Sequence, residues 1–276
     1  MKQGYAGTDF IRVTVKRAFH IRFFLSFFLI CLAFFLDTEV SMRQIMLGKY
    51  PPTGTEGIVL YLEYVLLYGT NYKLFLIFMT LGYGTSFPAD YKCGMVHGFV
   101  SRMGIKTYAR IQIGISALSG GLAVAGGFLL YFFWMRMFIP VIPEHFRETG
   151  MYDWLEAMPY YGDLTQENAR LFVVYMLLIL FLSGVTWTAL AAGFSVYLNH
   201  TYLVMIFPYF LSRMYIEAAK MLRLPDEIRI DRWFTGLTQP FPIPVCLGLL
   251  LVFCVFICII GRRIFSKALK WRLENG

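Results

Sequence analysis

The sequence predicts an all-α polytopic membrane protein, and three observations lead to this prediction. The 276 residues are 58% hydrophobic and 15% charged, whereas soluble domains are about half apolar and a quarter charged. Several apolar runs are close to the ~20 residues that a helix needs to cross a bilayer. Basic residues gather in alternate connecting segments, as they do in proteins that cross a membrane several times. These observations disfavour a large soluble α domain.

Residues 1–20 are expected to form an interfacial elbow helix before the first span. Apolar side chains fall on one stripe at helical spacing: Ile11, Val15, Ala18 and Phe19. Basic side chains lie beside or opposite that stripe: Arg12, Lys16 and His20. The pattern suits a helix in the headgroup layer whose basic face meets anionic lipid, although an extension of the first span into water stays open. The polar start and the lack of a small-residue cleavage site predict no cleavable signal peptide.

Six transmembrane helices are expected in a single domain that covers residues 1–276. The spans are residues 21–36, 72–88, 107–133, 170–197, 201–218 and 242–262, each about long enough to cross when tilt is allowed for. Residues 55–68 are apolar but contain Glu56 and Glu63, which indicates a partly buried outer helix before span two. Residues 219–241 are rich in Trp, Phe and Pro, which is typical of short interfacial helices, here before span six.

The charge distribution predicts the orientation. With the N-terminus inside, the inner segments hold 14 of the 25 basic residues and three of the 17 acidic residues, so their net charge is +11 and that of the remainder is −3. Short basic segments stay in the cytoplasm. We therefore expect both termini on the cytoplasmic side of a bacterial plasma membrane.

The sequence lacks the motifs of common catalytic, metal and nucleotide sites. It has no HExxH, no GxSxG and no GxxxxGK[ST] pattern, so we expect no enzyme activity, bound cofactor or metal in this chain. Its five cysteines form no CxxC pair, which indicates reduced thiols without a disulfide framework or zinc site. Acidic residues are nearly absent from the spans, which disfavours a proton-coupled secondary transporter.

Residues 86–110, SFPADYKCGMVHGFVSRMGIKTYAR, form a basic connector between spans two and three that glycines punctuate. Gly94 and Gly104 would let the chain turn at either end. Apolar side chains could fill a pocket on a soluble partner: Met95, Val96 and Phe99. Arg102 and Lys106 would complement an acidic groove or lipid headgroups. The alternative is a solvated loop whose charge only fixes topology.

This connector resembles the coupling segment of ABC-2 type permeases, the membrane subunits of a class of ATP-binding-cassette exporters. The matching residues are Asp90, Gly94, Ser101, Arg102 and Lys106. The inner turn between spans four and five, within residues 193–211, is also similar, and its matching residues are Asn199, Tyr202 and Pro208, with His200 beside them. The chain departs from the family in having Met95 after the glycine, where many members have Thr, and Met103-Gly104 near the basic residue, where many have Pro.

The resemblance implies a permease subunit of an ABC exporter with residues 89–106 as its cytoplasmic coupling segment. The residues that would dock an ATPase are Asp90, Gly94, Met95, Phe99, Arg102 and Lys106. ATP and Mg would be bound by partner ABC ATPase subunits, and the chain would pair with an identical or paralogous permease in the lipid bilayer, without nucleic acid. The aromatic spans suit a hydrophobic or amphipathic cargo, such as a peptide or bacteriocin, a lipid or a drug.

Two other functions stay open, and so does the role of the small residues in two spans. The chain could be a secondary transporter, or a non-transporting membrane scaffold or sensor subunit. Small residues in span four (Gly184, Ala189, Ala191, Ala192 and Gly193) and in span three (Gly120, Gly121, Gly126 and Gly127) could serve packing within one bundle or a contact between subunits.

Overall fold

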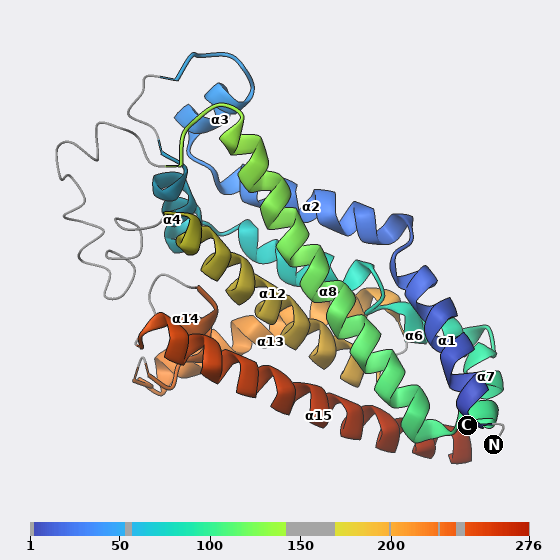
Figure 1. The fold of residues 1–276 in the computed structure, drawn as a ribbon. Helices are drawn as coiled ribbons and strands as arrows, with labels where there is room; N and C mark the ends of the chain where they lie inside the picture. Colours follow the sequence, from blue (N-terminus) through green and yellow to red (C-terminus); the bar gives the residue numbers. More distant parts are fainter. Residues whose placement is uncertain are drawn as a thin grey trace.

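The computed structural model describes residues 3–52, 57–141, 169–198, 200–225, 227–235 and 241–275, and these residues form helices and turns with no strand (Figure 1). The α-helices are α1 (Gln3–Ala18), α2 (Ile21–Asp37), α3 (Val40–Met46), α4 (Ile58–Tyr68), α5 (Phe75–Phe78), α6 (Ser86–Lys92), α7 (Met95–Met103), α8 (Ile105–Arg136), α12 (Ala169–Phe194), α13 (Thr201–Met221), α14 (Ile230–Thr235) and α15 (Ile243–Asn275). Short 3₁₀ helices flank α5, η1 at Tyr72–Leu74 and η2 at Met79–Leu81.

The long apolar helices identify a multi-pass membrane protein. Four stretches are long and apolar enough to cross a bilayer: Phe10–Asp37, Ile105–Arg136, Leu171–Phe194 and Ile243–Asn275. Large apolar side chains are exposed along α2 and α15, including Phe24, Phe28, Val252 and Phe256. Because water would oppose such a surface, these side chains face lipid or another membrane subunit.

The two ends of the bundle differ in their elements. The connector end holds the start of α1, all of α7, the start of α8 and the end of α15, so both chain ends lie together there (Figure 1). The far end holds α3, α4 and α14 (Figure 1). Buried apolar side chains form one large cluster toward each end, with Phe34 and Phe128 in the far one and Tyr108 and Phe265 in the other.

Helices cover the expected spans one, three, four, five and six, although α15 continues about three and a half turns beyond its expected end. Span two differs, because residues 72–88 do not form one helix. The segment consists of η1, α5, η2, a turn and then α6. Pro88 lacks a backbone N–H, so it is tolerated where it lies, in the first turn of α6. The turn before α6 contains Gly84. A Cβ added at Gly84 would lie 3.1 Å from Thr188 and 3.2 Å from Thr80, so the chain packs closely there.

The N-terminal helix α1 exists, but its buried face differs from the predicted stripe. Phe10, Thr14 and Ala18 are buried, at i, i+4 and i+8. Of the stripe, Ala18 alone is buried, whereas Ile11 and Val15 are exposed. Helix α1 thus has apolar residues on two sides, one buried against the bundle and one left exposed. Its position in the headgroup layer stays a prediction.

The small residues of spans three and four are used within this chain. An added Cβ at Gly184 would lie 2.8 Å from the carbonyl oxygen of Gly120 and 2.9 Å from the Cα of Gly121. At Gly193 it would lie 2.9 Å from the Cα of Gly261. These glycines therefore bring α8, α12 and α15 into backbone contact. Packing within one bundle is the role that the structure supports.

Candidate functional site

The connector forms two short helices joined by tight glycine turns. Gly94 separates α6 from α7 with φ of +71°, and Gly104 separates α7 from α8 with φ of +80°. Residues with a Cβ rarely adopt these values, so glycine is required for conformation at both positions. The predicted turns are thus present, and they place α7 across the connector end of the bundle (Figure 1).

Asp90 is the buried anchor of the connector. Its two carboxylate oxygens accept hydrogen bonds from the guanidinium of Arg17 on α1, at 2.5 and 3.1 Å. The Asp90 side chain is 3% exposed, and that of Arg17 is 35% exposed. A bidentate pair of this kind fixes orientation as well as distance. Asp90 therefore connects α6 to α1. Its position in the sequence suggested a docking surface, but its side chain is buried under Arg17.

Polar side chains from three helices surround this ion pair. A cavity of about 540 Å³ lies beside it, and Arg17, Tyr83, Ser86 and Asp90 contribute to its walls. Deeper in the bundle, the amide nitrogen of Gln112 on α8 donates a hydrogen bond of 2.7 Å to the Ser86 hydroxyl. Hydrogen bonds of this kind join helices in a membrane. The ion pair is thus the end of a polar seam between α1, α6 and α8.

The inner face of α7 packs on its own chain. Val96 is fully buried. The ring of Phe99 lies 4.6 Å from the ring of Phe10 on α1, centroid to centroid. Phe99 is half-buried in this contact, so in this structure it fills a pocket of the same chain. The predicted apolar docking set is reduced to Met95, whose side chain is 40% exposed.

The end of α15 also holds the connector. Arg272 lies over the ring of Tyr91, with its guanidinium carbon 4.8 Å from the centroid, which is within range of a cation–π contact. Phe265 meets Phe87 edge to face at 5.0 Å. Residues from α1, α8 and α15 thus enclose α6 and the inner side of α7.

The outward side of the connector is basic. Its exposed cations are Lys92, Arg102, Lys106 and Arg110. None of them forms an ion pair with a described residue, and the connector's acidic residue, Asp90, is buried under Arg17. An exposed positive face with one apolar side chain, Met95, matches a partner that is acidic around a small apolar pocket.

The predicted inner turn lies partly outside the described residues, since Asn199 falls there. His200 is described; its backbone is extended, and its carbonyl oxygen accepts the N–H of Leu203 at 3.1 Å, which begins α13. Among the described residues, no group of three His, Cys, Asp or Glu side chains could hold a metal ion.

Sequence reasoning missed Arg17, Tyr91 and Arg272 as parts of the site. Arg17 was counted only among the basic residues of the inner segments, and its partner is 73 residues away. The sequence offers no local signal for a pair at that separation. An acid in an otherwise basic connector was the one available hint.

Comparison with known protein families, curated proteins and solved structures finds no match to this chain. Inferences about its function therefore depend on its residues and geometry.

Proposed function

We propose that this chain is the membrane-spanning permease subunit of an ABC exporter of the ABC-2 type. It would move a hydrophobic or amphipathic cargo, such as a peptide or bacteriocin, a lipid or a drug, with ATP hydrolysed by separate ATPase subunits. The observation that carries the proposal is the connector, in which the inner side of α7 packs on its own chain. Its exposed cations lie on α7 and on the adjoining ends of α6 and α8: Lys92, Arg102, Lys106 and Arg110. A soluble partner can bind such a helix, and a movement of the helix would displace the elements of this chain that pack against it.

The contacts of the connector suit it for transmitting force. A push on α7 passes to α1 through the ring contact of Phe99 with Phe10 and through the pair of Asp90 with Arg17. It passes to α15 through Arg272 on Tyr91. It passes directly to α8, which begins at Gly104. Helices held by ion pairs and close packing move as units, which is how a small displacement reaches distant parts of a protein.

The arrangement in the membrane follows from the same proposal. Six crossings result when α13 and the segment from Tyr72 to Lys92 are added to the four long apolar stretches. At 21 residues, α13 is about 31 Å long, which is enough to cross the hydrocarbon core. The connector end, with both termini, would face the cytoplasm of a bacterium, and α1 would lie along the inner surface. A second permease chain would complete the pathway.

Copurification tests the proposal. The tagged chain is purified from the membranes of its native host, and bound proteins are identified by mass spectrometry. Wild type should retain an ATPase subunit that carries a Walker A motif, and Arg102→Glu with Lys106→Glu should remove at least nine-tenths of it, because charge reversal repels an acidic groove.

Arg263→Glu with Lys267→Glu is the matched control. These two residues are also exposed, four apart and at the connector end, but they lie on α15. The control should retain the ATPase. Equal retention by both double variants would refute docking through the connector. Absence of any ATPase from the wild-type preparation would instead favour a secondary transporter or a non-transporting scaffold.

A further inference from the structure

The far half of the bundle contains a cavity that the connector does not involve. Its volume is about 340 Å³, which is within the range of small-ligand pockets. Its charged lining among the described residues is five cations and one anion: Lys73, Arg213, Lys220, Arg229, Arg232 and Asp231. The charges of this lining sum to +4, and Arg229 holds Asp231 through a contact of 2.8 Å.

The cations lie close enough to repel one another. Lys73 is within electrostatic range of both Arg213 and Lys220, and the carboxylate of Asp37 opposes their effect. Lys220 is 3.0 Å from Glu217 at the exposed rim. The carboxylates of Asp37, Glu217 and Asp231 offset part of this positive charge, and an anionic ligand would offset more of it. The cavity therefore favours an anionic ligand.

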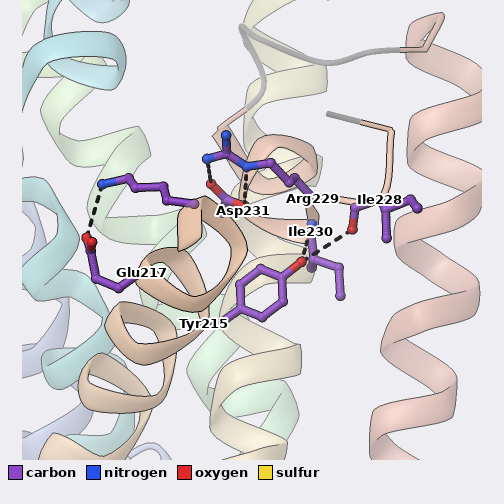
Figure 2. A network of polar contacts seen from close by, with 7 residues as sticks. Tyr215, Glu217, Ile228, Arg229, Ile230 and Asp231 are labelled. Atoms are coloured by element: carbon purple, nitrogen blue, oxygen red, sulfur yellow. Dashed lines mark hydrogen bonds and ion pairs between the residues drawn. The ribbon is translucent and has the colours of Figure 1, made fainter. Parts of the chain in front are cut away.

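The wall of this cavity is held in place without a ligand. The Tyr215 hydroxyl donates to the carbonyl oxygen of Ile228 at 3.3 Å and accepts the N–H of Ile230 at 3.0 Å (Figure 2). This joins α13 to the segment that carries Arg229 and Asp231. A wall already fixed loses little entropy when a ligand binds.

The cavity is also lined by apolar side chains and by one hydroxyl group that has no hydrogen-bond partner among the described residues. Phe75, Leu76, Trp187 and Phe234 supply the apolar surface. Ser183, past the midpoint of α12, is 1% exposed, and its hydroxyl has no hydrogen-bond partner among the described residues. Buried hydroxyls are nearly always paired, so this one indicates an acceptor or donor that occupies the cavity.

We propose that this cavity binds an anionic membrane amphiphile, one whose headgroup phosphate is not neutralised by a cation of its own. Arg213 and Lys73 contact the phosphate, since guanidinium and ammonium groups are its usual partners. The aromatic lining takes the adjoining apolar part, and the Ser183 hydroxyl bonds a polar group of the ligand. The inference goes beyond the proposed function, because binding requires neither ATP nor a second chain.

Native mass spectrometry of the purified full-length chain in a neutral detergent tests this proposal. The probes are dioleoyl phosphatidylglycerol, dioleoyl phosphatidylcholine and inorganic phosphate. Wild type should bind phosphatidylglycerol at least tenfold more tightly than phosphatidylcholine and at least a hundredfold more tightly than inorganic phosphate. Lys73→Gln with Arg213→Gln should weaken phosphatidylglycerol binding at least tenfold.

Arg223→Gln is the matched control, because Arg223 is an exposed cation two residues beyond the C-terminal end of α13 and does not line the cavity. It should change binding by less than twofold. Equal binding of the two lipids, equal binding by the cavity variant, or equally tight inorganic phosphate would overturn the proposal.

If the double variant does not fold, fluorescence quenching of Trp187 in the lining tests the proposal. Phosphatidylglycerol with brominated chains should quench Trp187 fluorescence, measured as the difference from Trp187→Phe. Brominated phosphatidylcholine at the same concentration should not. Quenching by neither lipid, or by both alike, would contradict the proposal.

Discussion

At the scale of single residues, Asp90 shows how one position can resemble a surface motif and act as an anchor. It belongs to an exposed connector by sequence, yet its side chain is 3% exposed and bonded to Arg17. Taking a carboxylate out of water is costly unless a cation compensates for it. The ion pair with Arg17 therefore allows Asp90 to be buried where α6 packs on α1.

Replacing Asp90 with Asn should destabilise the protein by about 2 kcal/mol. Breaking a buried pair costs about 3–5 kcal/mol, and the value is lower here because Arg17 is 35% exposed and partly hydrated. The thermal unfolding midpoint in detergent should fall by about 4–8 °C. The exchange Arg17→Asp with Asp90→Arg should recover part of the loss.

The control for this prediction is Glu274→Gln. Its carboxylate lies 3.7 Å from Lys270, and both side chains are more than half exposed. Exposed pairs contribute little, so its midpoint should match wild type. If Asp90→Asn and Glu274→Gln have the same midpoint, the anchor role of Asp90 is wrong.

At the scale of elements, close approach of α8 and α12 depends on glycines that face each other. Gly184 meets backbone atoms of Gly120 and Gly121, which cannot rotate away as a flexible side chain would. Overpacking of this kind typically costs about 1–3 kcal/mol.

Gly184→Ala should therefore lower the unfolding midpoint in detergent. Gly114→Ala is the matched control on α8, because nothing lies within 4 Å of its added Cβ. That control should equal or exceed wild type, since Ala is favoured over Gly inside a helix by about 1 kcal/mol. A lower midpoint for the control, or an unchanged midpoint for Gly184→Ala, would contradict the packing described for these helices.

The elements that sequence predicts well are those that composition alone determines. The apolar runs give α2, α8, α12, α13 and α15 to within three residues at every end except the C-terminal end of α15, because a long run of apolar side chains favours one continuous helix in a membrane protein. The same reasoning failed for residues 72–88. A count of apolar residues does not detect the backbone turn before Pro88. That turn separates α6 from the short helices before it, so residues 72–88 do not form one helix.

The candidate site was predictable only in part, for a related reason. Glycine turns and exposed cations are local features, so Gly94, Gly104, Arg102 and Lys106 are where the sequence indicated. Burial of Asp90 results from tertiary contact with α1. In a membrane protein both the bundle and the lipid attract apolar side chains, so periodicity alone does not tell which face of α1 is inside.

At the scale of the whole molecule, the account depends on which side of the membrane the connector faces. Cys93 is an exposed thiol in the connector, whereas Cys31, Cys246 and Cys254 are buried. A membrane-impermeant maleimide should label this position in inside-out vesicles and not in right-side-out ones.

Cys93→Ser should abolish that labelling, which shows that the signal comes from the connector. Labelling from the outside of intact cells would place the connector on the wrong face for a cytoplasmic ATPase. It would also reverse the orientation inferred from the charge of +11.

The proposed docking can be tested most directly by photo-crosslinking from α7 in living cells. Benzoylphenylalanine replaces Met95, which is 40% exposed on α7, and in a control it replaces Met221, which is 85% exposed at the end of α13. The account predicts an adduct of the Met95 probe with an ABC ATPase subunit, identified by its peptides, and none from the Met221 probe. Adducts from Met95 with lipid alone, or with ATPase from both positions alike, would contradict it.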